Sequence, residues 1–83
     1  MPMTAPYFTG LDTTDQLNAL YFEGHILANR YEDEFIYLLY SLDSFYVEVR
    51  HDACNNQVNA VTAFTSTDKL EPYLPYLTEA ALS

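Results

Sequence analysis

The sequence has few basic residues, and this limits the partners that the chain can bind. Among its 83 residues only Arg30, Arg50 and Lys69 are basic, whereas twelve are acidic, so the formal net charge is −9. Proteins that bind nucleic acid obtain most of their affinity by neutralising phosphates with lysine and arginine. Direct nucleic-acid binding is therefore disfavoured, and the anionic surface of a membrane would also repel this chain.

Long apolar runs are missing as well. No stretch approaches the roughly 20 apolar residues that span a bilayer, and residues 1–6 contain no basic residues followed by an apolar segment, as a secretory signal would. The single Cys54 permits no intramolecular disulfide, so the fold depends on packing alone and a reducing compartment is expected. We therefore expect a soluble protein of the cytoplasm.

Sequence motifs for catalysis or cofactor binding are also absent. Neither of the two glycines opens a strand-to-helix phosphate loop. His51, Asp52 and Cys54 lie within four residues, but proximity in sequence does not give the hydrogen-bonded geometry of a Cys-His nucleophile. Paired Cys or His spacing for zinc is missing too. We interpret this cluster as a polar hairpin loop and expect no enzyme activity, cofactor or metal, although a small enzyme using these three residues is an alternative.

What the chain does contain is enough apolar material for one core. Apolar residues make up 49% of the sequence, including eight Tyr and five Phe. Because 83 residues are near the lower limit for one core, residues 1–83 are expected to form a single domain. Residues 1–10 contain two prolines and no periodicity, so we expect an irregular N-terminal arm.

The first helix is predicted over residues 14–22. Thr13 and Gln16 have the spacing of a capping box at its start. Gly24 is placed to end it, because glycine adopts the left-handed stop conformation without penalty.

A second helix is predicted near the C-terminus. Residues 66–68 offer several N-caps, but Pro72 and Pro75 remove backbone donors, so the helix should be short or kinked. Leu70, Leu74 and Leu77 are expected to face the sheet from it.

Between the helices, β-branched and aromatic segments alternate with polar turns, as in a meander. Strands are predicted at residues 25–31, 34–42, 44–51 and 58–64, with turns at residues 32–33, near Asp43, and at residues 52–56. The fold class is α+β: a four-stranded antiparallel β-meander flanked by an N-terminal and a C-terminal short helix in a single two-layer domain.

Two-residue turns, taken at residues 32–33 and 42–43, assign each side chain to one face of this sheet. The face expected under both helices carries Leu27, Ile36, Leu38, Tyr40, Phe45, Val47 and Val49. The opposite, outer face carries Ile26, Ala28, Arg30, Phe35, Tyr37, Leu39, Tyr46, Glu48 and Arg50. In this registry both arginines lie beside Phe35. A shift of one residue, from a longer loop or a bulge, would reverse the assignment.

The outer face is half apolar, and contiguous apolar patches often mark partner surfaces. We therefore expect an interaction domain that self-associates or binds a protein partner. The expected contact residues are Arg30, Phe35, Tyr37, Leu39, Tyr46 and Arg50. In a plainer interpretation these are ordinary strand residues, and both arginines form cross-strand pairs with Glu34 and Glu48. Another alternative is an acidic decoy, inhibitor or immunity-type protein that occupies a basic surface, because strong negative charge steers such association.

Overall fold

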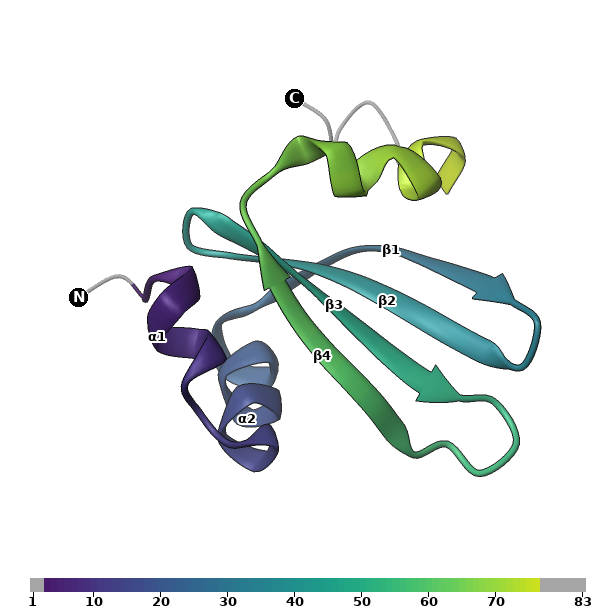
Figure 1. Cartoon of the computed structure of the whole chain (residues 1–83), viewed down its shortest axis with the longest axis horizontal. Coiled ribbons are helices and arrows are strands. Elements are labelled where there is room, and N and C mark those ends of the chain that lie inside the picture. Colours follow the sequence, from purple (N-terminus) through teal and green to yellow (C-terminus); the bar gives the residue numbers. More distant parts are fainter. Residues whose placement is uncertain (1–2, 77–83) are drawn as a thin grey trace.

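Four segments rich in β-branched and aromatic residues form an antiparallel sheet in the computed structural model, which describes residues 3–76. The strands are β1 (His25–Glu32), β2 (Phe35–Leu42), β3 (Phe45–Asp52) and β4 (Val58–Phe64). Each strand pairs with the next one in sequence, so the spatial order is β1-β2-β3-β4 (Figure 1). The predicted α+β class, with a four-stranded antiparallel sheet and short helices, is confirmed.

Both hairpin turns lie one residue beyond their predicted positions. They consist of residues 33–34 and 43–44, and Asp33 and Asp43 have positive φ angles of 57° and 52°. Aspartate tolerates this conformation better than most residues because its short side chain bonds locally. Moving a two-residue turn by one position changes the sum of paired residue numbers by two, so each side chain keeps its face. The predicted alternation is retained in β2 and β3, but the cross-strand neighbours change.

A bulge in β1 reverses the faces predicted for two residues. Ile26 pairs with Tyr40, whereas Ala28 pairs with Leu39, so one extra residue lies between the two pairs. Ile26 therefore shares a face with Tyr40, while Leu27 packs with Ala28 and Leu39. The face predictions for Ile26 and Leu27 were wrong because a bulge shifts the local parity by one.

The N-terminal segment contains a helix, α1 (Ala5–Thr9), where an irregular arm was predicted. The hydroxyl of Thr4 accepts a backbone hydrogen bond at its start, and Pro6 lies in the first turn, where its missing N–H breaks no helical bond. Phe8 is completely buried, with its ring centroid 5.7 Å from that of Phe45. The prediction failed because a proline in the first turn is compatible with a helix.

The helix α2 (Thr13–Glu23) follows, slightly longer than predicted. Its N-cap is Asp12, whose carboxylate accepts a backbone hydrogen bond at 2.8 Å, and Thr13 is the first helical residue. Gln16 is buried and donates from Nε2 to the carbonyl of Phe8 at 3.0 Å. The predicted capping box is therefore wrong, and Gln16 instead links the two helices.

Gly24 ends α2 for a different reason from the one predicted. Its φ and ψ are −78° and 153°, which is extended backbone and not the left-handed region. A Cβ at this position would lie 2.7 Å from the carbonyl oxygen of Leu20. Glycine is required here because the chain passes too close to the last turn of α2 for any side chain.

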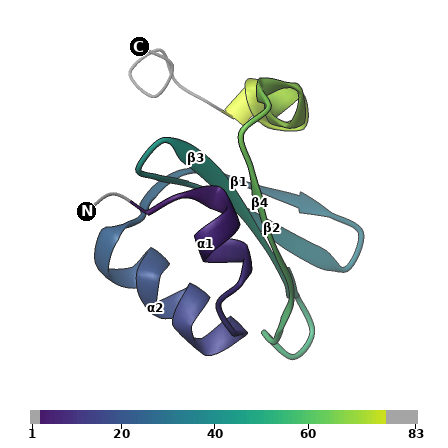
Figure 2. The ribbon, with the colours of Figure 1, turned by 60° about the vertical axis from the view of Figure 1, so that its left-hand side comes forward.

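The two N-terminal helices lie on one side of the sheet (Figure 2), and the larger hydrophobic cluster joins them to it. Its buried members come from α1, α2, β2 and β3: Phe8, Leu20, Leu42, Phe45, Val47 and Val49. Burial of each large apolar side chain contributes about 1.5–3 kcal/mol relative to exposure. This face of β3 is the predicted core face.

The C-terminal 3₁₀ helix η1 (Thr67–Tyr76) packs against the other face of the sheet. Tyr73 is completely buried there and Leu70 is half-buried, whereas Leu74 is 51% exposed, contrary to the prediction. Leu77 lies outside the described residues. The two-layer arrangement is not confirmed, because η1 and the N-terminal helices pack against opposite faces (Figures 1 and 2).

Candidate interaction site

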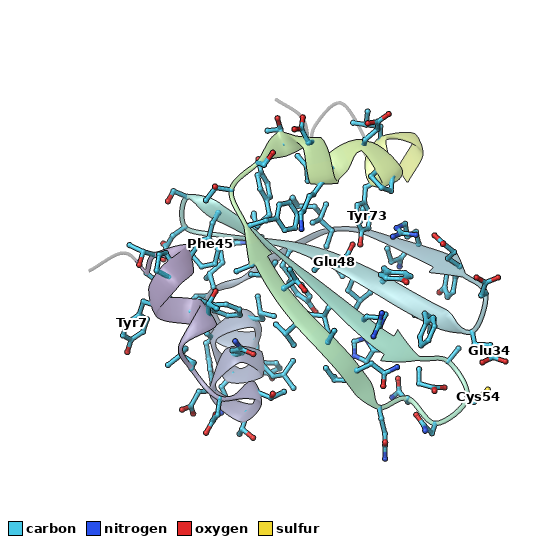
Figure 3. The ribbon with its side chains drawn as sticks, viewed as in Figure 1. Tyr7, Glu34, Phe45, Glu48, Cys54 and Tyr73 are labelled. Carbon is cyan, nitrogen blue, oxygen red and sulfur yellow. The ribbon has the colours of Figure 1, made fainter. Side chains whose placement is uncertain are left out.

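Tyr73 of η1 is held in a polar and aromatic site on the sheet. Its hydroxyl donates to Oε2 of Glu48 on β3 at 2.5 Å, and its ring centroid lies 5.1 Å from Cζ of Arg30 on β1. Figure 3 shows the Tyr73 side chain directed from η1 toward the sheet, where Glu48 lies. A buried hydroxyl needs such a partner, because leaving it unpaired would cost free energy.

The surroundings keep this phenol neutral. Burial raises the pKa of Tyr73 above its ordinary value, and the hydrogen bond to Glu48, together with the negative charge there, raises it further. The hydroxyl therefore remains a donor across the physiological pH range.

Arg30 is enclosed by rings and carboxylates. Its Cζ lies 4.0 Å from the ring centroid of Tyr37, and its guanidinium pairs with Glu32 and, at 3.9 Å, with Glu48. Burial by itself lowers the pKa of Arg30, but the hydrogen bond to Glu32 and the favourable electrostatic interactions outweigh this, so the pKa is raised. Within the described part of the chain its buried Nε has no hydrogen-bond partner. Aromatic faces therefore replace hydrogen bonds on part of this guanidinium.

The same face continues toward the start of β2 and the end of β3. Arg30 and Arg50 both pair in register with Tyr37, not with Phe35 as predicted. The Arg50 guanidinium still lies over the Phe35 ring, with Cζ 4.9 Å from its centroid, and the Phe35 and Tyr37 centroids are 6.4 Å apart. We call Tyr73, Arg30, Tyr37, Phe35 and Arg50 the aromatic-arginine row.

Two further predicted contact residues are packed against neighbours on this face. Leu39 is completely buried, so it stabilises the fold and cannot contact a partner in this conformation. Tyr46 is half-buried and stacks on Phe64 with centroids 5.7 Å apart. Phe35, Tyr37 and Arg50 are each partly exposed, as Arg30 and Tyr46 also are, so these five form the accessible part of the predicted surface.

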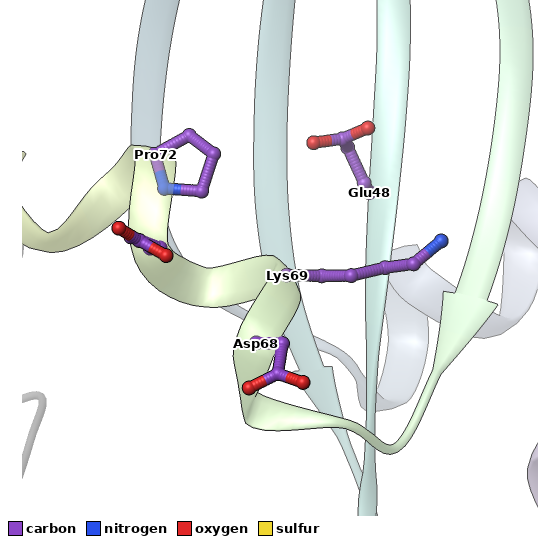
Figure 4. A pocket seen from close by; sticks show the side chains of 5 residues that line it. Glu48, Asp68, Lys69 and Pro72 are labelled. Carbon is purple, nitrogen blue, oxygen red and sulfur yellow. The ribbon is translucent and has the colours of Figure 1, made fainter.

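A cavity of about 530 Å³ lies between η1 and the sheet (Figure 4). Its lining consists of Glu48, Asp68, Lys69, Glu71 and Pro72. The lining therefore carries three carboxylates and one ammonium group, and in Figure 4 the Lys69 side chain extends from η1 toward β4. The cavity is acidic, as is the chain as a whole.

The His51-Asp52-Cys54 cluster forms no catalytic arrangement among the described side chains. Cys54 is exposed, and its backbone N–H donates to Oδ1 of Asp52 at 2.8 Å, a local turn interaction. His51 and Asp52 are successive strand residues and point to opposite faces. Within residues 3–76 no group of three or more His, Cys, Asp and Glu residues is arranged to hold a metal ion.

Sequence reasoning missed a second set of exposed apolar side chains. Tyr21 and Phe22 at the end of α2 are 82% and 77% exposed, and Ile26 and Tyr31 on β1 are 57% and 70% exposed. Consecutive aromatic residues at the end of a short helix cannot both face one core. The adjacent Tyr21 and Phe22 could therefore have indicated an exposed aromatic side chain from the sequence.

Across residues 3–76, no helix has the length and apolar character needed to cross a membrane. Comparisons of the chain with protein-family models, curated proteins and solved structures found no match.

Proposed function

We propose that this protein is a non-enzymatic interaction domain that binds a second copy of itself or another protein through the accessible part of the aromatic-arginine row. The contacts would come mainly from Phe35, Tyr37 and Arg50, with Arg30 and Tyr46 at the border with η1. The main support is that these aromatic side chains remain partly exposed on a face that η1 covers only in part. Aromatic residues and arginine are also the types enriched at binding hot spots.

The composition of the row favours a protein partner. Phe35 and Tyr37 offer apolar area, and the Arg50 guanidinium stacked on Phe35 leaves donors for carboxylates or carbonyl oxygens. The proposal includes a cytoplasmic location. The single cysteine is exposed and can form no disulfide within the chain, which fits a reducing compartment.

The test combines light scattering with capture of partners from a lysate of the native organism. We expect Tyr37→Glu to abolish self-association or capture, because it places a charge in the centre of the surface. Tyr31→Glu is the matched control: Tyr31 is on β1, but its pairing with Ile36 places it on the opposite face. A monomeric mass together with unchanged capture by Tyr37→Glu would refute the proposal.

A second candidate is an acidic decoy, inhibitor or immunity-type protein that occupies a basic surface. It is favoured by the net charge of −9 and by the carboxylate-lined cavity beside η1. Binding of this kind weakens steeply as salt rises, because surface charges are screened. Capture that is unchanged between low and high salt would favour the aromatic interface and exclude the decoy.

A further inference from the structure

We propose that the sheet carries a receptor site for a tyrosine side chain, formed by Arg30, Glu48 and Leu39, and that Tyr73 is the internal ligand of this site. A partner segment that carries a tyrosine would bind there when η1 detaches. This inference rests on the proposed use of the sheet face, but its test requires no natural partner.

The site recognises both ends of a phenol. Glu48 accepts from the hydroxyl at 2.5 Å, and the guanidinium of Arg30 lies 5.1 Å from the ring centroid. Leu39 belongs to the same cluster as Tyr73 and is completely buried. A phenylalanine would retain the ring contacts but leave the carboxylate without its donor, so the site distinguishes tyrosine from phenylalanine.

The protein groups of the site are organised by strand pairing and not by η1. Arg30 sits over Tyr37, its cross-strand partner on β2, with Cζ 4.0 Å from the ring, and it pairs with Glu32 on its own strand. Glu48 pairs in register with Leu39. The site therefore retains its side-chain contacts within the sheet when η1 leaves, which lowers the cost of binding a new ligand.

The packing of η1 is separable from the main core. Among the side chains that the structure describes, the larger cluster contains none from η1, and those of Tyr73 and Leu70 belong to the smaller cluster. Leu74 is half exposed, and Pro72 supplies no backbone donor. A 3₁₀ helix has poorer hydrogen-bond geometry than an α-helix. Detachment of η1 therefore exposes one small cluster and leaves the larger one intact.

The chemistry of the partner follows from the site and from the charge of the domain. The ligand group is a tyrosine, and the chain around the site carries a net charge of −9. η1 itself contributes two acids and one lysine to the cavity beside the site. A tyrosine flanked by basic residues would interact more favourably with this domain than the internal segment does, particularly at low salt.

The experiment uses the full chain with Tyr73→Ala, which empties the site, and synthetic peptides of residues 66–76 as probes. Both peptides carry Tyr76→Phe, and they differ only by Tyr73→Phe. We expect the tyrosine peptide to bind the variant at least tenfold more tightly than the phenylalanine peptide, as a hydrogen bond to a carboxylate predicts. Wild-type protein, whose site is occupied, should bind the tyrosine peptide more weakly than the variant does.

Two results would overturn the proposal. One is a folded Tyr73→Ala chain that binds neither peptide or binds both equally. The other is loss of the sheet signal in circular dichroism, which would make Tyr73 an integral part of the fold.

Hydrogen exchange on the wild-type chain gives an independent measurement. Amides of η1 should exchange through local opening, faster than those of β2 and β3. Exchange of η1 only with global unfolding would exclude a detachable ligand. If the peptides bind but no partner is captured from lysate, the proposed cellular interaction fails while the receptor site stands.

Discussion

The hydroxyl of Tyr73 and the carboxylate of Glu48 form the one hydrogen bond that joins η1 to the sheet through side chains of the described residues, at 2.5 Å. The two residues are 25 positions apart, so this contact closes the C-terminal part of the chain onto β3. It also replaces solvent around a carboxylate whose nearest cationic neighbour, Arg30, is 3.9 Å away. One donor thus supplies the polar part of the attachment of η1, and the apolar packing of Tyr73 and Leu70 supplies the rest.

Tyr73→Phe tests the strength of this attachment. The substitution retains the ring but removes the donor to a partly buried carboxylate, so the free energy of unfolding should fall by about 1.5–3 kcal/mol. Urea unfolding followed by circular dichroism measures the change. Tyr7→Phe is the control, because Tyr7 is 63% exposed and should change the stability by no more than about 0.5 kcal/mol. Equal stability of both variants would show that the bond contributes nothing net.

Alkaline pH should weaken the attachment of η1 by ionising the Tyr73 hydroxyl. A chain that lacks this hydroxyl should not show this change. The pKa of Tyr73 is raised in the folded state above its ordinary value of 10.0, by burial first and then by Glu48. The bond therefore contributes fully to stability below about pH 10 and loses this contribution as pH rises above that value through the raised folded pKa. A titration of tyrosinate absorbance should show a late ionisation coupled to loss of structure. The coupled step should vanish in Tyr73→Phe and persist in Tyr7→Phe, and its persistence in both would refute the assignment.

The two glycines should respond oppositely to substitution by alanine. In Gly24→Ala the new Cβ would lie 2.7 Å from the backbone oxygen of Leu20, so the chain must shift, at a cost of about 1–3 kcal/mol. In Gly10→Ala the nearest atom is 3.5 Å away and φ is −79°, so the change should be neutral or stabilising by about 0.4–1 kcal/mol. Denaturant midpoints of the two variants against wild type give the comparison. A tolerated Gly24→Ala would mean that the junction after α2 is less tightly packed than described.

The four strands, and the face of the sheet to which most side chains of β2 and β3 point, could be predicted from the sequence. Apolar residues that recur at every second position are a clear strand signal, and the errors in the turns changed the sum of paired residue numbers by two, which preserves the faces. The bulge at Leu27 could not be predicted, since nothing in a short apolar run marks an extra residue. The predicted cross-strand neighbours of Phe35 were wrong, because the same two-residue change in pairing that preserved its face gave it different partners.

The candidate site was less accessible to sequence reasoning than the sheet. Arg30, Tyr37 and Arg50 were placed correctly on one face, but which face η1 covers depends on tertiary packing and not on periodicity. Leu70, Tyr73 and Leu74 have similar apolar character, and only the docking of η1 determines that Tyr73 is buried and Leu74 exposed. The buried hydroxyl of Tyr73 gave no sequence signal, because its partner Glu48 is distant in the chain.

In the N-terminal segment, two adjacent aromatic residues have opposite environments. Phe8 is completely buried against Phe45, while Tyr7 is 63% exposed. Phe8→Ala should lower the free energy of unfolding by about 3–5 kcal/mol, because it removes a large core side chain and leaves a cavity. Since small domains have total stabilities of about 5–15 kcal/mol, this loss would leave the variant marginal at ambient temperature. Tyr7→Ala should change stability by no more than about 0.5 kcal/mol. Thermal and urea unfolding of the two variants measure this difference. A Phe8→Ala chain as stable as Tyr7→Ala would mean that residues 1–10 form an irregular arm and that Phe8 does not pack against Phe45.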